Sequence, residues 1–318
     1  MRTAFLEALC AVAERDQSVW LLTADLGYSV LEPFRDRFAG RYVNVGVTEQ
    51  NLIGVAAGLA RCGKIVFVYS IANFPTLRCL EQIRNDVCYH EGNVKIVAVG
   101  GGFTYGPQGY THHGIEDLAI LRALPGMTVV APADPVEARL ATRALAARPG
   151  PCYLRLGKAN EPVAHAAEPD FALGRAVSVR AGRDVTLIST GGMLRECLAV
   201  AERLHGQGVE SRVISMHTLK PLDSEAVLRA ARDTGGIVTA EEHSVTGGLG
   251  SAVADVIAES GVRCGFFRKF GVPDERYHRV GSQEHMRGLC GDLYETVLSL
   301  LRRFRAAHAA QRSKRLSA

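Results

Sequence analysis

The regular alternation of short apolar runs with helical stretches is the feature of this sequence that most constrains its fold. Val, Ile and Leu fill most positions of these runs, as in IVFVYS at 65–70. Strands that are apolar on both sides belong to parallel sheets with helices on both faces. We therefore predict an α/β fold for the first half, with strands at 19–24, 43–47, 65–70, 94–99, 127–131 and 152–156 and helices near 3–15, 29–38, 48–61, 76–90, 116–123 and 134–147.

The alternation stops between residues 157 and 178 and then starts again. This stretch contains Pro162 and Pro169 and few strand or helix signals, so we expect a linker there. We predict two α/β domains, each with a mostly parallel sheet flanked by helices, at 1–160 and 178–305, with a linker at 161–177 and a basic tail at 306–318. Strands of the second domain are expected at 184–190, 210–216, 236–241 and 264–268, and helices at 192–206, 223–233, 248–260, 282–288 and 292–306.

Composition excludes several classes of protein. The 318 residues are 47% apolar and 22% charged, which is typical of globular proteins, and no apolar run approaches the roughly 18 residues of a membrane span. No export signal is visible at the N-terminus. The eight cysteines form no CxxC pair or regular spacing, which argues against a disulfide framework or a zinc site. We expect a cytoplasmic protein with reduced thiols and no membrane partner.

Basic residues are concentrated at the C-terminus. Six of them follow Glu295, and no acid lies among them. Their combined charge of +6 exceeds the net charge of +4 for the whole chain. A basic tail can bind nucleic acid, but no nucleic-acid-binding fold is recognisable beside it. We therefore expect a frayed, solvated terminus and no nucleic-acid partner.

One acid, Glu49, stands where an apolar strand meets a helix. Thr48 is a plausible N-cap, so Glu49 falls in the first helical turn, where the helix dipole favours a negative charge. Its position after a strand also places it at the carboxyl end of the sheet, where open α/β folds build their sites. The helix behind it is rich in Gly and Ala, which permits a close approach of another backbone. A dipole-complementing surface acid and a functional acid both remain open at this point.

A second candidate is the glycine-rich loop at 99–114, which carries His112 and His113. Gly100, Gly102 and Gly106 imitate a dinucleotide fingerprint, but the helix that this fingerprint needs begins only near Ile115. We interpret the glycines as a flexible loop of close approach. Because adjacent histidines point apart, a shared metal is not expected, and one imidazole facing a polar cleft as an acid, base or hydrogen-bond donor is favoured.

A third stretch, TAEEHSVTGGLGSAV at 239–253, runs from a strand through acids and glycines into a helix. Gly247, Gly248 and Gly250 could hold a phosphate at the helix N-terminus. Close packing of strand and helix explains the same glycines, and we favour this structural interpretation.

Together these stretches resemble the C-terminal half of transketolase-type thiamine diphosphate enzymes. The resemblance covers nearly the whole chain in family order. It implies a pyrimidine-binding domain followed by the transketolase C-terminal domain. The residues that carry it are GVTEQN with GVAAGLA, RCLEQIRND at 78–86, GYTHHGIEDLAILRALPGMTVVAPAD at 109–134, YLRLGK at 153–158 and EEHSVTGGLGSAVADVIAE at 241–259.

The resemblance also implies roles at the cofactor. Glu49 would contact the aminopyrimidine N1′ and promote removal of the thiazolium proton, while the cofactor acts as the electron sink. His112 would hydrogen-bond the oxygens of the donor sugar and so share in catalysis. Stacking on the aminopyrimidine is expected from Phe74, with Tyr69 as the second choice, and Asp25 is expected near the thiazolium.

Substrate contacts are implied at a further set of residues. Arg155, Ser29 and Arg2 match positions that hold a sugar phosphate, where a guanidinium suits the anion. Gln108 stands where sugar-phosphate relatives carry an aspartate that reads a donor hydroxyl. A family histidine is replaced within 100–102 by glycine. The donor's phosphate end and its hydroxyl recognition are therefore expected to differ from the family pattern.

The resemblance finally implies a partner. No Gly-Asp-Gly occurs in the sequence, so the domain that binds the cofactor diphosphate and Mg²⁺ is missing, and no metal ligand is expected in this chain. We expect one component of a split transketolase-like enzyme, active only with a Gly-Asp-Gly subunit and α₂β₂ by family analogy, that transfers a two-carbon ketol unit between sugars. The alternatives are a 2-oxo-acid dehydrogenase beta subunit, a deoxyxylulose-phosphate synthase-like activity, a non-catalytic regulatory subunit and a dinucleotide-binding oxidoreductase.

Overall fold

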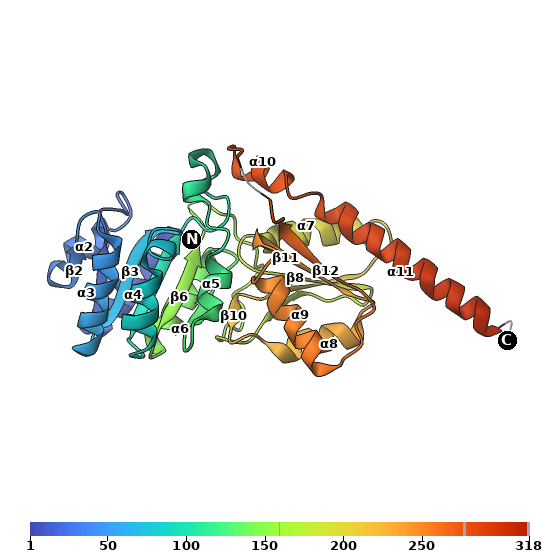
Figure 1. The fold of residues 1–318 in the computed structure, drawn as a ribbon, viewed down its shortest axis with the longest axis horizontal. Helices are drawn as coiled ribbons and strands as arrows, with labels where there is room; N and C mark the ends of the chain where they lie inside the picture. The colour runs from blue at the N-terminus through green and yellow to red at the C-terminus, as the bar shows by residue number, and fades with distance from the viewer. Residues whose placement is uncertain (159, 276–277, 317–318) are drawn as a thin grey trace.

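The computed structural model describes residues 1–158, 160–275 and 278–316, with side chains described as far as residue 310 except residue 308. It contains two sheets that lie side by side along the long axis of the molecule, each covered by helices (Figure 1). This arrangement confirms the predicted α/β class and the two mostly parallel sheets. The described residues between Leu156 and Val177 form neither helix nor strand.

The first sheet has seven strands in the order β10-β5-β6-β4-β3-β1-β2, and all neighbouring pairs are parallel except β10 with β5. Each residue of β4 is buried, which explains why five of its six residues are apolar. The exception is Lys95, whose ammonium donates to the carbonyls of Arg148 and Gly150. In the register of the central pair, Tyr69 of β3 lies opposite Val97 of β4. The strands contributed by the first half are β1 (Val19–Thr23), β2 (Tyr42–Asn44), β3 (Ile65–Ile71), β4 (Val94–Val99), β5 (Thr128–Val130) and β6 (Cys152–Leu156).

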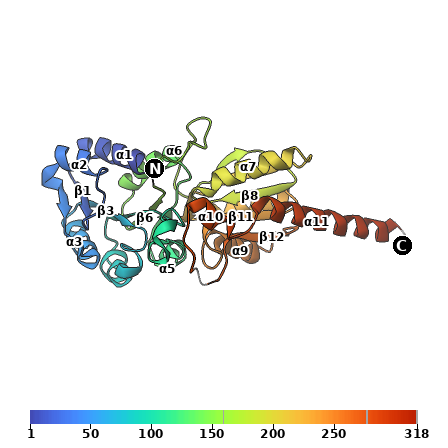
Figure 2. The same cartoon turned by 90° about the horizontal axis from the view of Figure 1, so that it is seen from above.

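Helices cover both faces of this sheet. One face packs against α1 (Arg2–Arg15), α2 (Glu32–Arg37) and α6 (Pro135–Ala147), and the other against α3 (Glu49–Arg61) and α5 (Asp117–Ala123). Figure 2 shows α1 and α6 on one side of the strands and α3 and α5 on the other. Small Ala residues along α3 and α6 let these helices approach the sheet closely.

The second sheet has the order β12-β11-β8-β9-β7, in which only β7 is antiparallel. Helices α7 and α11 pack on one face, and α8 and α9 on the other. Its elements are β7 (Val177–Arg180), β8 (Val185–Ser189), α7 (Met193–His205), β9 (Ser211–Ser215), α8 (Ser224–Asp233), β11 (Ile237–Ser244), α9 (Leu249–Ser260), β12 (Phe267–Val272), α10 (Gln283–Gly288) and α11 (Leu293–Leu316).

A short strand from the second half completes the first sheet. β10 (Thr218–Lys220) pairs antiparallel with β5, with Thr218 opposite Val130. The ammonium of Lys220 donates to the carbonyls of Arg122 and Leu124. No strand was predicted here, because three residues are too few to show a period. One apolar core cluster also includes residues of both halves, so the two domains are packed as a continuous unit.

Three further elements differ from the prediction. Strand β7 was not predicted, and it begins at the last residue of the expected linker. The helix expected at 76–90 is instead a 3₁₀ turn (Leu77–Cys79), a short α4 (Leu80–Gln82) and a π-helix (Ile83–Cys88). π-Helical turns are frequent at functional sites because they redirect side chains out of the regular helical spacing. The strand expected at 264–268 lies three residues later, in β12, because the ladder to β11 begins only at Phe267.

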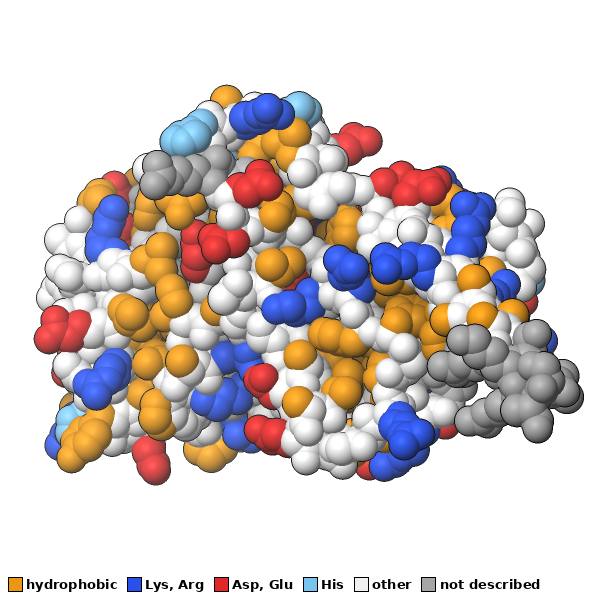
Figure 3. Space-filling model, turned by 45° about the vertical axis from the view of Figure 1, so that its right-hand side comes forward, with side chains coloured by type: hydrophobic (Ala, Val, Ile, Leu, Met, Phe, Trp, Pro, Cys, Tyr) orange, Lys and Arg blue, Asp and Glu red, His pale blue; other side chains and the backbone are white. Residues whose placement is uncertain are grey.

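The basic tail is helical as far as the structure describes it. Helix α11 continues to Leu316 and projects from the body of the molecule, so the backbone of 306–316 is not frayed as expected (Figure 1). The side chains of Arg312, Lys314 and Arg315 lie outside the described residues. Over the face in Figure 3, basic side chains are interspersed with acidic and apolar ones. Among the described helices, none is both long and apolar enough to cross a membrane.

Candidate active site

The carboxyl ends of the parallel strands bring together loops that are far apart in the sequence. Loops after β1, β3, β4 and β6 leave the first sheet at one edge. The chain passes from β1 outward to β2 and then returns across β1 to β3, so the strand order reverses there. Crevices outside such reversals are the usual ligand sites of open α/β sheets.

Glu49 is the first residue of α3 and is buried at this edge. Its side chain is 3% exposed, and the N-cap Thr48 makes no side-chain capping bond. Arg78 Nη1 donates to Glu49 Oε2 at 2.8 Å, while the Arg78 side chain is 51% exposed. Burial, and next the charge of Glu49, raise the pKa of the neighbouring Cys79 thiol to about 12. Glu49 is therefore a shielded carboxylate with one half-exposed partner, and not a surface acid.

Phe74 connects Glu49 with His112. The guanidinium carbon of Arg78 lies 5.0 Å from the centroid of the Phe74 ring, and the His112 ring lies edge-on to Phe74 with a centroid distance of 5.3 Å. His112 ends a 3₁₀ turn (Tyr110–His112) and is half-buried. The fold thus places Glu49, Arg78, Phe74 and His112 in one connected cluster.

The second histidine of the pair supports the loop from inside. His113 is fully buried and its Nε2 lies 3.2 Å from the Gly106 carbonyl oxygen. The Asn73 amide donates to the His113 carbonyl at 2.7 Å. The two histidines therefore point apart, and only His112 borders the Phe74 cluster. Gln108 lies exposed in the same loop, in a 3₁₀ turn (Gly106–Gln108).

Tyr69, the other aromatic candidate, belongs to the core. It is 3% exposed and stacks on Phe5 of α1 at a centroid distance of 6.1 Å. Burial raises the pKa of its hydroxyl, and the nearby Arg2 partly opposes this. Phe74 is half-buried and is the candidate that borders Glu49's partner and His112.

The loop after β1 carries two residues with left-handed backbone. Asp25 has φ 56° and Ser29 has φ 59°, a conformation that costs a non-glycine residue energy and is concentrated at functional sites. Hydrogen bonds from Tyr28, then from Asn44, lower the pKa of the Asp25 carboxyl. The exposed Ser29 donates its backbone N–H to Glu32. The structure places both residues at the sheet edge, on the side of β1.

Arg155 is occupied by protein partners. Its side chain is 6% exposed, its Nε donates to Asp117 Oδ2 at 2.8 Å, and its Nη2 donates to the carbonyls of Gly114 and Glu242. These contacts tie β6 to the His112 loop and to the second domain. This geometry suits a structural brace better than the sugar-phosphate ligand that the sequence suggested.

Lys158, which the sequence interpretation passed over, is better placed as a free cation. It follows β6 by two residues, is exposed, and holds its ammonium 5.4 Å from the centroid of the Tyr105 ring. The Arg2 N–H donates to the Lys158 carbonyl at 3.2 Å, and Arg2 Nε is buried without a partner. In the described part of the chain neither cation has a carboxylate partner. The sequence position could have indicated this difference, because Lys158 lies beyond the end of β6, whereas Arg155 lies within it.

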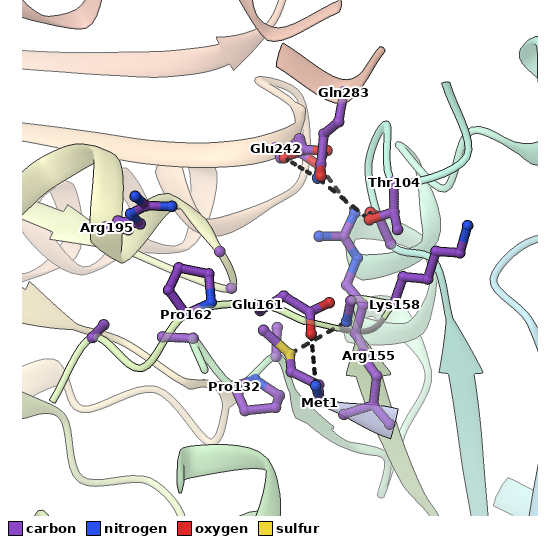
Figure 4. Close-up of a pocket in the computed structure, with 18 of the residues that line it drawn as sticks. Met1, Thr104, Pro132, Arg155, Lys158, Glu161, Pro162, Arg195, Glu242 and Gln283 are labelled. Atoms are coloured by element: carbon purple, nitrogen blue, oxygen red, sulfur yellow. Dashed lines mark hydrogen bonds and ion pairs between the residues drawn. The ribbon is translucent and has the colours of Figure 1, made fainter. Parts of the chain in front are cut away.

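A cavity of about 310 Å³ extends from this point between the domains. Figure 4 shows Arg155 and Lys158 on the side of the first domain and Arg195 on the side of the second. At its floor the N-terminal amine of Met1 bonds to Glu161 at 2.6 Å. The cavity wall therefore carries cationic groups together with the carboxylates of Glu161 and Glu242, and it lies next to the Arg2–Lys158 pair.

The glycine turn at 246–250 is closed by a carboxylate of the protein. Glu241 accepts the backbone N–H groups of Leu249 at 2.7 Å and Gly250 at 2.8 Å at the start of α9. This carboxylate takes the place that a phosphate would need. The first glycine loop is followed by two 3₁₀ turns and not by a helix, so it too lacks the geometry of a dinucleotide site.

Two buried groups beside that turn have pKa values shifted in opposite directions. Burial raises the pKa of Glu241 to about 7, against the opposing effect of its two N–H donors, and burial lowers the pKa of His243 to about 4. His243 Nδ1 lies 3.6 Å from Glu241 Oε2, and its Nε2 lies 4.0 Å from Asp117 Oδ1 in the first domain. The domain contact therefore contains a pH-sensitive pair.

Substituting either member should reveal opposite pH dependences of stability. The contribution of Glu241 is present below its usual pKa of 4.5 and is lost as the pH rises toward 7. The contribution of His243 is present above its usual pKa of 6.5 and is lost as the pH falls toward 4. Relative to wild type, Glu241→Gln should therefore lose stability from pH 6.5 to 4.5, and His243→Gln should gain it. Urea unfolding at both pH values measures this, and profiles parallel to wild type would contradict it.

Comparison with known proteins agrees over both domains. Residues 1–163 match the family described as transketolase, pyrimidine binding domain, and residues 174–290 match transketolase, C-terminal domain. The 6-deoxy-6-sulfo-D-fructose transketolase subunit SqwH of Clostridium sp. (strain MSTE9) is 40% identical over 99% of this chain and 95% of that protein. An apulose-4-phosphate transketolase subunit of Phocaeicola vulgatus is 38% identical over 89% of this chain and 90% of that protein. A solved split gene transketolase, an inactive beta4 tetramer, is 38% identical with a TM-score of 0.85, covering 95% of this chain and 96% of that one.

Proposed function

This chain belongs to the transketolase family, as one subunit of a split thiamine diphosphate-dependent transferase, and we propose that Glu49 and His112 carry its part of the reaction. The observation that supports this is the cluster in which Phe74 connects the buried Glu49 and its partner Arg78 with His112. All four come from loops or helix starts at the carboxyl edge of the first sheet.

The residues present fit the pyrimidine end of the cofactor. A shielded carboxylate and a neighbouring half-buried aromatic face suit a planar, nitrogen-rich ring that must share a proton and stack. The bound cofactor would supply the electron sink for cleavage of a carbon–carbon bond. Glu49 would hold a proton at the ring nitrogen, and Phe74 would orient the ring. Asp25 is proposed to lie next to the cofactor.

Substrate recognition is proposed at the other side of the cluster. His112 would hydrogen-bond the oxygens at the reacting end of the donor, and Gln108 would read a donor hydroxyl as an uncharged amide. Arg2, Ser29 and Lys158 would face the distal end of the sugar, with Lys158 taking the role first assigned to Arg155. The relatives are named for a sulfo sugar and a sugar phosphate, so we propose a ketose with a terminal anionic group.

The partner is proposed to complete the site. Within the described ranges no group of three His, Cys, Asp or Glu side chains could hold a metal ion. We propose that a Gly-Asp-Gly subunit holds Mg²⁺ and the cofactor diphosphate, and that the complex forms as α₂β₂. Two of the relatives are themselves named as transketolase subunits, and the solved split transketolase is a beta4 tetramer, which supports a separate partner chain.

Reconstitution tests this function. The chain would be expressed alone and with a candidate Gly-Asp-Gly subunit, and ketol transfer would be assayed with thiamine diphosphate, Mg²⁺ and ketoses that carry phosphate, sulfonate or no anion. Activity is expected only from the mixture and mainly with an anionic ketose. Substantial activity of the chain alone would refute the split site, and turnover of pyruvate in place of ketoses would favour a 2-oxo-acid or deoxyxylulose-phosphate synthase-like reaction.

A further inference from the structure

The guanidinium of Arg78 contacts both Glu49 and Phe74. It donates to the buried Glu49 carboxylate at 2.8 Å, and its central carbon lies 5.0 Å above the Phe74 ring. A guanidinium is planar, carries N–H donors on its edge and stacks on aromatic faces. Arg78 is therefore a flat group that lies over the Phe74 ring and at the same time hydrogen-bonds Glu49.

A cofactor pyrimidine would need the same two contacts. This step rests on the proposed function, in which the ring shares a proton with Glu49 and stacks on Phe74. Two planar groups cannot both lie on one face of Phe74 and both bond Glu49 Oε2. We propose that Arg78 is a placeholder for the pyrimidine ring, which occupies the ring's position in the cofactor-free subunit and leaves when the cofactor binds.

The surroundings of Arg78 allow this exchange. Its side chain is 51% exposed, so the ion pair is screened by water and weak. The backbone is held separately, because the Gln50 amide donates to the Arg78 carbonyl at 3.1 Å. The side chain can therefore swing outward while its 3₁₀ turn (Leu77–Cys79) stays in place.

The burial of the Glu49 carboxylate explains why Arg78 would stabilise the cofactor-free subunit. The carboxylate is 3% exposed, and a buried carboxylate without a partner is strongly unfavourable. Arg78 satisfies it while the ring is absent, and the ring nitrogen replaces Arg78 on binding. The same pair then competes with the cofactor, so removal of Arg78 should strengthen cofactor binding and weaken the cofactor-free chain.

Arg78→Met tests this prediction, since methionine keeps an unbranched apolar chain but cannot donate to Glu49. In the complex with the partner, calorimetric titration should give thiamine diphosphate binding roughly two- to fivefold tighter than wild type, which corresponds to the strength of an exposed ion pair. In the Glu49→Gln background the gain from Arg78→Met should disappear. The thermal midpoint of the cofactor-free chain should fall.

Arg84→Met is the matched control. Arg84 is exposed in the adjacent π-helix, and among the described residues its side chain bonds Asn85 alone, so its loss removes the same charge nearby and should change neither quantity. Damage to the site would weaken binding, so the expected gain has the opposite sign. Unchanged or weaker binding by Arg78→Met, or a gain that persists in Glu49→Gln, overturns the placeholder alone. A wild-type complex that does not bind thiamine diphosphate overturns the proposed function and the placeholder with it.

Discussion

Glu49→Gln is expected to lower kcat of the reconstituted enzyme by about 10²- to 10⁴-fold, the usual contribution of a positioned acid or base. Glutamine keeps the size and one acceptor of the side chain but cannot exchange a proton with the cofactor ring. Because Glu49 is shielded, water cannot easily replace it. The measurement is the initial rate of ketol transfer at saturating cofactor and ketose.

The matched control is Glu225→Gln. Glu225 also lies in the first turn of a helix, α8, but is exposed and belongs to the second domain. If Glu49 acted only through the helix dipole, both variants would lose a similar small amount of stability and no activity. A Glu49→Gln complex that retains its rate would show that the glutamate is not catalytic and would favour a regulatory subunit.

Arg155→Met is expected to lower the free energy of unfolding by about 3–5 kcal/mol, because it leaves the Asp117 carboxylate buried without its charged partner. Asp117 is fully buried. Its Oδ2 keeps the Tyr153 hydroxyl as a donor, but its Oδ1 has no hydrogen-bond partner, so the lost positive charge is not replaced by another hydrogen-bonded cation. The expected fall in the thermal midpoint is about 10 °C. Urea and thermal unfolding of the isolated chain measure both quantities.

Lys158→Met provides the contrast. Lys158 is exposed with no carboxylate partner in the described part of the chain, so its loss should change stability by less than about 0.5 kcal/mol. In the reconstituted enzyme it should raise KM for an anionic ketose and leave KM for an uncharged ketose unchanged. A stable Arg155→Met protein with a raised KM would restore Arg155 as the substrate ligand.

The brace formed by Arg155 also gives the second domain a part in the site. Its Nη2 bonds the Glu242 carbonyl, and the Glu242 carboxylate accepts the Phe103 N–H at the base of the His112 loop. Gln283 and Arg287 hold that carboxylate in turn. The loop that carries His112 is thus fixed from both domains.

Much of this protein was determined by local sequence. Apolar runs such as 65–70 and 94–99 became buried parallel strands because both of their faces are covered, and this requirement is visible in composition alone. Glu49 could also be located at a strand end and helix start, because the order of strand, cap and helix is a local property. The family motifs added chemical roles to these positions.

Other features were decided only by the tertiary structure. Strand β10 exists because β5 offers an unpaired edge, which three residues of sequence cannot reveal. Tyr69 and Phe74 are both aromatic residues of one short stretch of sequence. The fold buries Tyr69 in the core and places Phe74 beside Arg78, the partner of Glu49. Arg155 and Lys158 carry the same charge, but Arg155 is paired with the buried Asp117 and acts as a brace, whereas Lys158 has no such partner in the described part of the chain. Local patterns specify strands and helices, whereas the partner of each charge depends on contacts between residues distant in the chain.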